Sequence, residues 1–365
     1  MISPEIEKNA FVSRVIWFLL FGVIVIALIY VYRVRNLSSR ECSFLDNIYG
    51  TIDGNIRSIS SNDPNCQYTL KDYYVKTAYN CCSGGSYKND FVSLCALKNL
   101  IRQGVRGFDF EIYNINETPV VSSSTSDSFY IKETYNYIYF SDAFTTIINN
   151  AFSGGTCPNP NDPVILHFRF KSNSQNIYTS MSNIFKSNNT YLLGENYSFE
   201  NYNTNLGDTP LLSLQGKIII IVDRNNTSFL ENNSFMEYVN MTSNSMFMRA
   251  LNYYDVSLTP DIQELQNFNR RNMTIVLPDS GADPANPGTI VSREAGCQMV
   301  AMRYQMVDQN LEENALFFDK SGYAFSLKPE RLRYVADTIP TPEDQNVAYD
   351  YTQRDYSTNY YSFQI

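Results

Sequence analysis

Two acidic side chains, Asp109 and Glu111, have the spacing of a shared cation site. They lie in the run Val105 to Tyr113, whose β-branched and aromatic residues are typical of a strand. Alternate side chains of a strand point to the same face, so both carboxylates face the same way. Carboxylate oxygens are ligands that calcium prefers. The pair therefore indicates either a cation site or, with a basic partner, a buried ion pair.

His167 is the only histidine of the chain, and histidine is the side chain that ordinarily exchanges protons near neutral pH. It lies in the predicted strand Val164 to Phe170 and shares a face with Ile165 and Arg169. We expect an interior imidazole whose hydrogen bonds are satisfied. A displaced catalytic base is the alternative interpretation.

Strands alternate with helices along the body of the chain. Asn89 to Gln103 is predicted as a helix, because Asn89 can cap it, apolar residues recur at helical spacing and Gly104 can end it. A second helix is expected at Ser141 to Phe152. Strands are expected at Tyr73 to Tyr79, Val105 to Tyr113, Pro119 to Ser122, Val164 to Phe170, Gly216 to Asp223, Thr274 to Leu277 and Cys297 to Tyr304. This alternation predicts parallel pairing in a barrel or a doubly wound sheet.

The composition limits the possible functions. The 365 residues carry a formal net charge of −9, which argues against nucleic-acid binding because that requires clustered Lys and Arg. The same charge is unfavourable for a polyanionic lipid headgroup. Seven cysteines leave disulfides possible, but the Cys81-Cys82 pair lacks metal-ligand spacing and a single histidine excludes a mixed Cys/His zinc site. The redox compartment stays open.

The run Val15 to Tyr32 contains no charged residue and is dominated by Ile, Val, Leu and aromatic residues. As a helix it measures roughly 27 Å, close to the thickness of a bilayer core. A cleaved signal peptide is the alternative. The bulky end of the run, followed by Arg33 and Arg35, favours an uncleaved single-pass anchor.

The sequence does not decide on which side of the membrane the body lies. Lys8 and Arg14 precede the span and Arg33, Arg35 and Arg40 follow it, which weakly favours a cytoplasmic body. Several Asn-x-Ser/Thr motifs point the other way, although such motifs also arise by chance in a chain rich in Asn, Ser and Thr. They begin at Asn36, Asn116, Asn188, Asn196, Asn225, Asn232, Asn240 and Asn272.

The chain divides into an N-terminal tail (1–14), the span (15–32), a polar neck (33–70), a body (71–335) and a tyrosine-rich tail (336–365). About 320 residues follow the span, enough for one large α/β barrel. The Asn/Tyr/Ser-rich segment 172–210 gives no clear secondary structure. The tail is interpreted as a partly ordered surface extension, with a partner-docking strap as the alternative. Its tyrosines are Tyr349, Tyr351, Tyr356, Tyr360 and Tyr361.

Five segments, in order along the chain, resemble phosphoinositide-specific phospholipase C. The last is the most specific, because its Gly-Cys-Gln-Met-Val-Ala run resembles the second half of the catalytic barrel of that family almost verbatim. The segments are Leu100 to Tyr113, Pro119 to Val121 with Ile138 to Phe152, Asp162 to Leu166, Leu214 to Ile218, and Ala295 to Ala301 with Ser326-Leu327-Lys328-Pro329.

For the fold, the resemblance implies a distorted TIM (β/α)8 barrel of the PLC-like phosphodiesterase type across 71–335, with its site at the C-terminal strand ends. One transmembrane helix would precede it. For the chemistry, the resemblance implies two acid–base histidines and a calcium ion, which together release diacylglycerol and an inositol phosphate. The two histidine positions are occupied here by Tyr79 and Ser123.

The calcium ligands that the resemblance implies are only partly present. Three positions hold Asn80, Asp109 and Glu111, which would form a residual calcium site. The fourth position holds Arg169, whose guanidinium we expect within hydrogen-bonding reach of Asp109 or Glu111.

The substrate-binding positions also depart from the pattern. Arg249 is the candidate for the substrate-binding arginine of the family, and the two headgroup lysines fall near Ile221 and Asp223. A neutral Tyr or Ser cannot take and return protons near pH 7 as His does.

These departures predict a catalytically inactive pseudoenzyme: a membrane-anchored barrel that serves as a lipid- or protein-binding or structural module. An active phosphoric diester hydrolase acting on phosphoinositides is the first alternative, with Asp109, Glu111, His167 and Arg249 as its candidate residues. A structural membrane protein of a virion or envelope is the second. No cofactor is expected unless the residual site holds calcium. The expected partners are the membrane and a phosphoinositide lipid or a protein, not nucleic acid.

Overall fold

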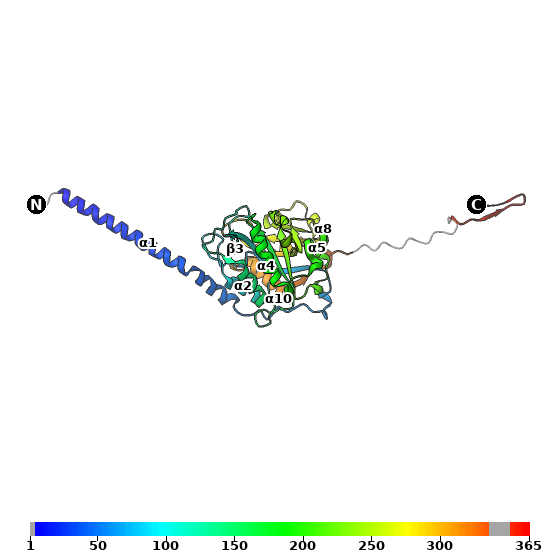
Figure 1. The fold of residues 1–365 in the computed structure, drawn as a ribbon, viewed down its shortest axis with the longest axis horizontal. Helices are drawn as coiled ribbons and strands as arrows, with labels where there is room; N and C mark the ends of the chain where they lie inside the picture. Colours follow the sequence, from blue (N-terminus) through cyan, green and yellow to red (C-terminus); the bar gives the residue numbers. More distant parts are fainter. Residues whose placement is uncertain (1–3, 336–350) are drawn as a thin grey trace. The chain divides into compact units, whose positions relative to one another are not determined.

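Eight parallel strands form a nearly closed barrel (Figure 1). The computed structural model describes residues 4–335 and 351–365. The barrel strands are β1 (Tyr73–Ala78), β2 (Gly107–Ile115), β5 (Val164–Phe170), β6 (Ile218–Asp223), β7 (Met241–Ser243), β8 (Met248–Asn252), β9 (Met273–Leu277) and β10 (Met299–Met302). They follow one another around the barrel in chain order, and β7 and β8 are the two strands at which the hydrogen-bonded sheet ends. The predicted (β/α)8 barrel is confirmed.

The two-residue period of the strands separates an inner from an outer layer. Leu166 and Phe168 of β5 face outward, into the apolar layer beneath the helices. Ile165 of β5 and Ile219 of β6 belong to a second apolar cluster, which fills the barrel. Every residue of β5 and β6 is buried, as expected for parallel strands covered on both faces. The bounds of β5 are those predicted from the sequence.

Helices cover the outside of the barrel. They are α2 (Leu94–Arg102), α3 (Phe140–Ala151), α4 (Gln175–Ser187), α5 (Ser198–Asn203), α6 (Asn233–Met236), α7 (Tyr253–Ser257), α8 (Ile262–Arg271), α9 (Thr289–Glu294) and α10 (Gln309–Ser321). The predicted start of α2 at Asn89 is wrong, because Ser93 caps the helix by accepting a hydrogen bond from the Cys95 N–H at 3.1 Å. Asn89 has a φ of 56°, outside the helical region. Gly104, with a φ of 70°, follows the end of the helix as predicted.

Three short strands are antiparallel. β3 (Thr118–Ser122) pairs with β2, β4 (Ile138–Tyr139) pairs with β3, and β11 (Phe325–Leu327) pairs with β1. The strand predicted at Pro119 to Ser122 is therefore present but does not follow the parallel pattern. Only Asn116 and Glu117 separate it from β2, and a parallel crossover needs a much longer connection.

A single 46-residue helix, α1 (Pro4–Tyr49), forms the N-terminal part of the chain (Figure 1). It contains the predicted span 15–32 and is long and apolar enough to cross a membrane. Most side chains from Phe11 to Tyr32 are exposed. The helix continues without a break to Tyr49, so the first half of the predicted polar neck is helical rather than irregular.

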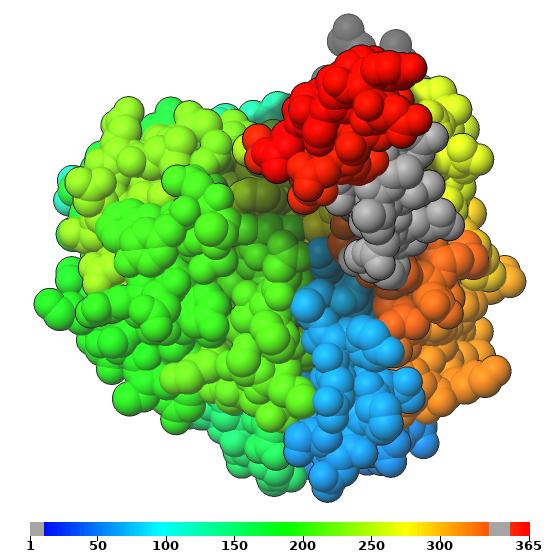
Figure 2. Space-filling view, turned by 90° about the vertical axis from the view of Figure 1, so that its right-hand side faces the viewer, coloured from blue at the N-terminus to red at the C-terminus, as the bar shows by residue number. Residues whose placement is uncertain are grey.

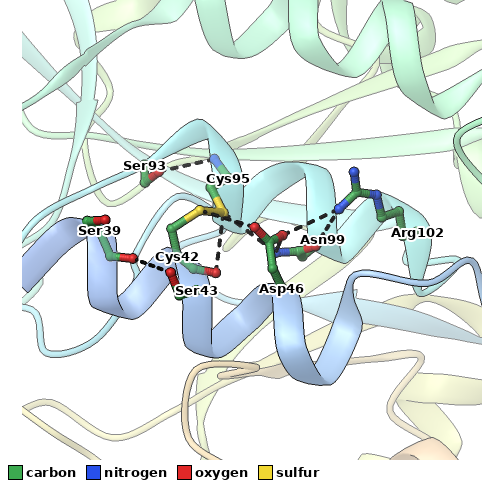
Figure 3. The surroundings of a disulfide bond; sticks show 8 residues. All are labelled: Ser39, Cys42, Ser43, Asp46, Ser93, Cys95, Asn99 and Arg102. Carbon is green, nitrogen blue, oxygen red and sulfur yellow. Dashed lines mark hydrogen bonds and ion pairs between the residues drawn. A yellow bond between two sulfur atoms is a disulfide. The ribbon is translucent and has the colours of Figure 1, made fainter.

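The C-terminal end of α1 is attached to the body. Cys42 of α1 and Cys95 of α2 form a disulfide (Figure 3). The Tyr49 hydroxyl donates a hydrogen bond to the Tyr304 carbonyl at 3.0 Å, next to the end of β10. These contacts hold residues 42–49 against the barrel.

The remaining half of the neck, residues 50–70, lies on the surface of the barrel. Figure 2 shows this blue segment between the green middle of the chain and the orange C-terminal part of the body. Isolated bridges pair Arg57 with Tyr323 and Thr69 with Pro210, so the segment connects the two parts.

Two regions that the sequence left open contain regular elements. Within 172–210, α4 packs on the barrel and is followed by short helical turns as far as Asp208. In the C-terminal unit, β12 (Asp355–Ser357) and β13 (Ser362–Gln364) pair in an antiparallel hairpin. Of the five tail tyrosines, Tyr349 lies outside the described residues.

Candidate functional site

The candidate residues meet at the C-terminal ends of the barrel strands. Asp109 and Glu111 of β2 lie directly opposite His167 and Arg169 of β5 in the sheet register. All four side chains are buried, with exposed fractions of 3% or less. Because they occupy alternate positions of two neighbouring parallel strands, they form two layers inside the same end of the barrel.

Arg169 lies between the acidic side chains. Its Nε donates to Asp109 Oδ1 at 3.0 Å and its Nη2 to Asp109 Oδ2 at 2.8 Å, which is a bidentate pair. Its Nη1 donates to Glu111 Oε1 at 2.9 Å and to Asp127 Oδ1. The predicted contact of Arg169 with Asp109 or Glu111 is confirmed, and the arginine contacts both.

The guanidinium also uses the third candidate ligand. The Oδ1 atom of Asn80 accepts a hydrogen bond from Arg169 Nη2 at 3.0 Å. The second carboxylate oxygen of Glu111 accepts hydrogen bonds from Tyr113 Oη at 2.5 Å and from the Ser124 N–H at 2.9 Å. The oxygens that would coordinate a calcium ion are therefore taken by donors of the protein itself. With a guanidinium among them, this donor set does not fit a calcium ion.

The electrostatics agree with a stable internal ion pair. Burial alone would raise the pKa of Asp109, but Arg169 and His167 hold it well below its usual range. Burial would likewise lower the pKa of Arg169, and the Asp109 carboxylate holds it above its usual value. For Asp127, burial is again outweighed by Arg169 and by Lys171, so its pKa is lowered. The carboxylates remain charged because the guanidinium faces them.

His167 has a partner on each ring nitrogen. Its Nδ1 lies 2.7 Å from Asp109 Oδ1 and its Nε2 lies 2.9 Å from the Ser243 hydroxyl of β7. A carboxylate only accepts, so Nδ1 carries the proton and Nε2 accepts from Ser243 in the neutral ring. His167 and Ser243 are both fully buried. The interior imidazole with satisfied hydrogen bonds is confirmed.

Tyr79 and Ser123, at the two positions where the resemblance places histidines, are also buried. The Tyr79 ring lies 4.6 Å from the Arg169 guanidinium and packs edge-on against Tyr87. Burial raises the pKa of Tyr79 well above its usual value, which keeps its proton in place. The Ser123 hydroxyl lies 3.4 Å from that of Ser83.

Two charged residues of the site were not found from the sequence. Asp127 comes from the loop after β3 and contacts both Arg169 and Lys171, whose Nζ donates to the Asp127 carbonyl at 2.7 Å. Lys171 could have been predicted, because it lies two residues beyond Arg169 and so faces the same way. Both line an open pocket of about 400 Å³, together with Asp223.

Arg249 has other partners. It forms a bidentate pair with Glu264 of α8 at 3.0 and 2.8 Å, and its guanidinium lies 3.8 Å from the centre of the Phe268 ring. Its neighbour Met248 belongs to the cluster inside the barrel, so Arg249 faces outward. The structure thus does not bring Arg249 to the Arg169 cluster.

Ile221 and Asp223, near which the resemblance places two headgroup lysines, lie on β6 and are both buried. Ile221 is fully buried in the inner cluster. Asp223 accepts a hydrogen bond from the Asn244 side chain at 2.7 Å.

Comparison with known proteins agrees with this architecture. Residues 220–331 match the phosphatidylinositol-specific phospholipase C Y domain. The structure of PLC21 from S. officinalis superposes with a TM-score of 0.59 at 15% identity, covering 75% of this chain and 39% of that one. For PLC21 from L. pealei the TM-score is 0.60 at 16% identity, covering 74% and 38%. No curated protein sequence matches the chain.

These matches define the class of the fold. Residues 220–331 are similar to the phosphatidylinositol-specific phospholipase C Y domain, and they form part of a PLC-like barrel. It spans less than two fifths of the length of the PLC21 chains, and at such identities the likeness concerns the fold alone.

Proposed function

We propose that this protein is a membrane-anchored PLC-like barrel without phosphodiesterase activity, which serves as a binding or structural module. The observation that carries the proposal is the position of Arg169. Its guanidinium contacts Asn80, Asp109 and Glu111, the three remaining candidate calcium ligands. A catalytic calcium would have to displace a buried, multiply hydrogen-bonded cation, which is strongly unfavourable.

The acid–base groups support the same conclusion. General acid–base assistance is worth about 10²–10⁴-fold per group. Tyr79, whose raised pKa keeps it neutral, and the buried Ser123 cannot supply it near pH 7. Without both groups the rate would fall by roughly 10⁴-fold or more, before the missing metal is considered.

The charge at the pocket disfavours a polyanionic ligand. The charged residues that line the pocket cancel, with Asp127 and Asp223 against Arg169 and Lys171. The buried Asp109 and Glu111, which contact Arg169, bring the formal charge of the whole cluster to −2. Both cations are already paired within the cluster. A phosphoinositide headgroup would meet net repulsion here, so a weakly charged lipid surface or a protein is the better-supported partner.

The position of one loop supports contact with a lipid surface. The Tyr135 hydroxyl lies 3.1 Å from that of Tyr30, near the end of the apolar run in α1. In the same loop Phe129, Tyr130 and Ile131 are exposed by 45%, 52% and 79%. Aromatic residues at this height of a membrane helix are suited to the bilayer interface. This loop also carries Asp127, which contacts Arg169.

The experiment is a phospholipase assay on the full-length chain in mixed micelles that contain phosphatidylinositol or its phosphorylated forms, with and without calcium. We expect no release of inositol phosphate above the protein-free background. The Tyr79→His/Ser123→His variant should also be inactive, because Arg169 still fills the calcium position. Calcium-dependent turnover by the unmodified chain that Asp109→Ala abolishes would refute the proposal.

A second candidate function is hydrolysis through Ser243, favoured by the hydrogen-bonded chain from Ser243 through His167 to Asp109 at 2.9 and 2.7 Å. This is the order of groups that activates a serine nucleophile. It is less well supported because Ser243 and His167 are fully buried. Labelling by a fluorophosphonate probe that is lost in Ser243→Ala, but retained in Ser245→Ala, would favour this function over the inactive module.

A further inference from the structure

A disulfide joins the membrane helix to the barrel. Cys42 of α1 and Cys95 of α2 are separated by 53 residues, and their Cα atoms lie 5.8 Å apart. Figure 3 shows Asp46, one turn further along α1, pointing toward α2, where its Oδ1 accepts a hydrogen bond from Asn99 Nδ2 at 2.9 Å. The disulfide is therefore part of an ordered contact between the two helices.

The placement of the cysteines points to an oxidising environment. Cys42 and Cys95 are only partly buried, at the junction of helix and barrel. The other five cysteines are buried and carry free thiols: Cys66, Cys81, Cys82, Cys157 and Cys297. A partly accessible disulfide persists in secretory or extracellular compartments and is reduced in the cytosol.

The Asn-x-Ser/Thr motifs differ in accessibility. Asn116 is exposed in the turn between β2 and β3, with Thr118 partly exposed beside it. Asn240 is buried, and its side chain bonds to the Ile220 N–H at 2.8 Å and to the Tyr197 carbonyl at 3.0 Å. A bulky, polar glycan suits the first position and would prevent folding at the second.

We infer that the barrel lies on the extracytoplasmic side of the membrane, with the Cys42–Cys95 disulfide formed and an N-linked glycan on Asn116. The flanking charges weakly oppose this orientation, since three arginines follow the span and two basic residues precede it. The two flanks of the span differ by only one basic residue. We give more weight to the disulfide in assigning the orientation, because the cytosol would reduce it.

This orientation has a consequence for the ligand. The anionic inositol lipids that attract basic proteins are concentrated in the cytoplasmic leaflet. A barrel on the opposite side does not face them. Phosphoinositides of the cytoplasmic leaflet are therefore out of reach of the barrel.

The test is translation of the full-length chain in the presence of endoplasmic-reticulum microsomes. We expect the body to be protected from added protease, and peptide:N-glycosidase F to increase its mobility. Thr118→Ala should remove one glycan, and the matched variant Thr118→Ser should retain it. Under non-reducing conditions Cys42→Ser should change the mobility, and a maleimide should label the wild type at this pair only after reduction.

Two results would overturn the inference. One is a body that is digested in intact microsomes, and the other is an unchanged glycan number in Thr118→Ala. The inference rests on the proposed function only in that α1 crosses the membrane. Carbonate extraction tests that part separately: a chain released by carbonate contradicts the anchor, whereas a retained but protease-sensitive chain contradicts the orientation alone.

Discussion

Replacing Arg169 by glutamine should destabilise the barrel strongly. Arg169 neutralises Asp109 and Glu111, whose exposed fractions are 0% and 1%, through three hydrogen bonds of 2.8 to 3.0 Å. Glutamine is neutral, so it leaves the buried carboxylates of Asp109 and Glu111 without their cation. Removal of one partner of a buried ion pair costs about 3–5 kcal/mol. For a domain of this size, that corresponds to a fall in Tm of roughly 6–10 °C.

The measurement is thermal unfolding followed by circular dichroism of the full-length chain in detergent, at pH 7. Arg249→Gln is the matched control, because Arg249 also forms a bidentate pair but is one third exposed, with Glu264 more exposed still. Exposed pairs contribute about 0–1 kcal/mol, so the control should unfold within about 3 °C of the wild type.

Calcium provides the decisive comparison. Without the guanidinium, the oxygens of Asn80, Asp109 and Glu111 become available to a divalent cation. We expect millimolar calcium to raise the Tm of Arg169→Gln and to leave that of the wild type unchanged. A ligand at 100 times its Kd stabilises the folded state by about 2.7 kcal/mol. The reasoning is refuted if wild-type Tm rises in micromolar calcium, or if Arg169→Gln is no less stable than Arg249→Gln.

Three further outcomes follow from the structure. Because the pKa of Asp109 is lowered in the folded state, its contribution to the free energy of unfolding should be fully present above about pH 5 and be lost with further acidification. In urea titrations the wild type should therefore lose stability more steeply below about pH 5 than Asp109→Asn. The Cys42→Ser/Cys95→Ser variant lacks the disulfide and should have a free energy of unfolding lower by about 4 kcal/mol, because the unfolded chain is no longer constrained by the cross-link. Denaturant titration under non-reducing conditions measures this difference. An unchanged unfolding midpoint would contradict the prediction. Burial lowers the pKa of Lys328 to about 7. Between about pH 7 and 10 the unfolded chain therefore holds a proton on this lysine that the folded chain has released, so the free energy of unfolding should rise with pH in this range, and Lys328→Met should lose this slope.

The barrel strands were predictable where their sequence is continuous and apolar. The run Ile218–Asp223 is short, apolar and rich in β-branched residues, which is typical of a strand covered on both faces. β7 has only three residues, Met241–Ser243. It was not predicted because three residues are too few to show the two-residue alternation of a strand. The start of α2 was misplaced since Asn89 and Ser93 are both good caps, and tertiary contacts of residues 83–92 decide between them.

The centre of the site was predictable for a different reason. Asp109, Glu111 and Arg169 lie on regular strands, so the two-residue period fixes their common direction, and the family resemblance places the strands next to each other. Asp127 lies in a loop whose course depends on the tertiary structure. Ser243, the partner of His167, comes from the unpredicted strand β7. Neither contact has a local sequence signal.

The geometry explains how the residues that the resemblance assigns to a calcium site can fold together around an arginine. An arginine in place of one carboxylate ligand changes the local charge by two units, which is the charge that one calcium ion supplies. The guanidinium then satisfies Asn80, Asp109 and Glu111 directly, as a coordinated ion would. The strand ends are thereby held together without a metal. The arginine does not replace the metal in catalysis, because a guanidinium has no open coordination position and does not lower the pKa of a bound hydroxyl as a metal ion does. The same substitution that stabilises the fold therefore argues against the phosphodiesterase reaction.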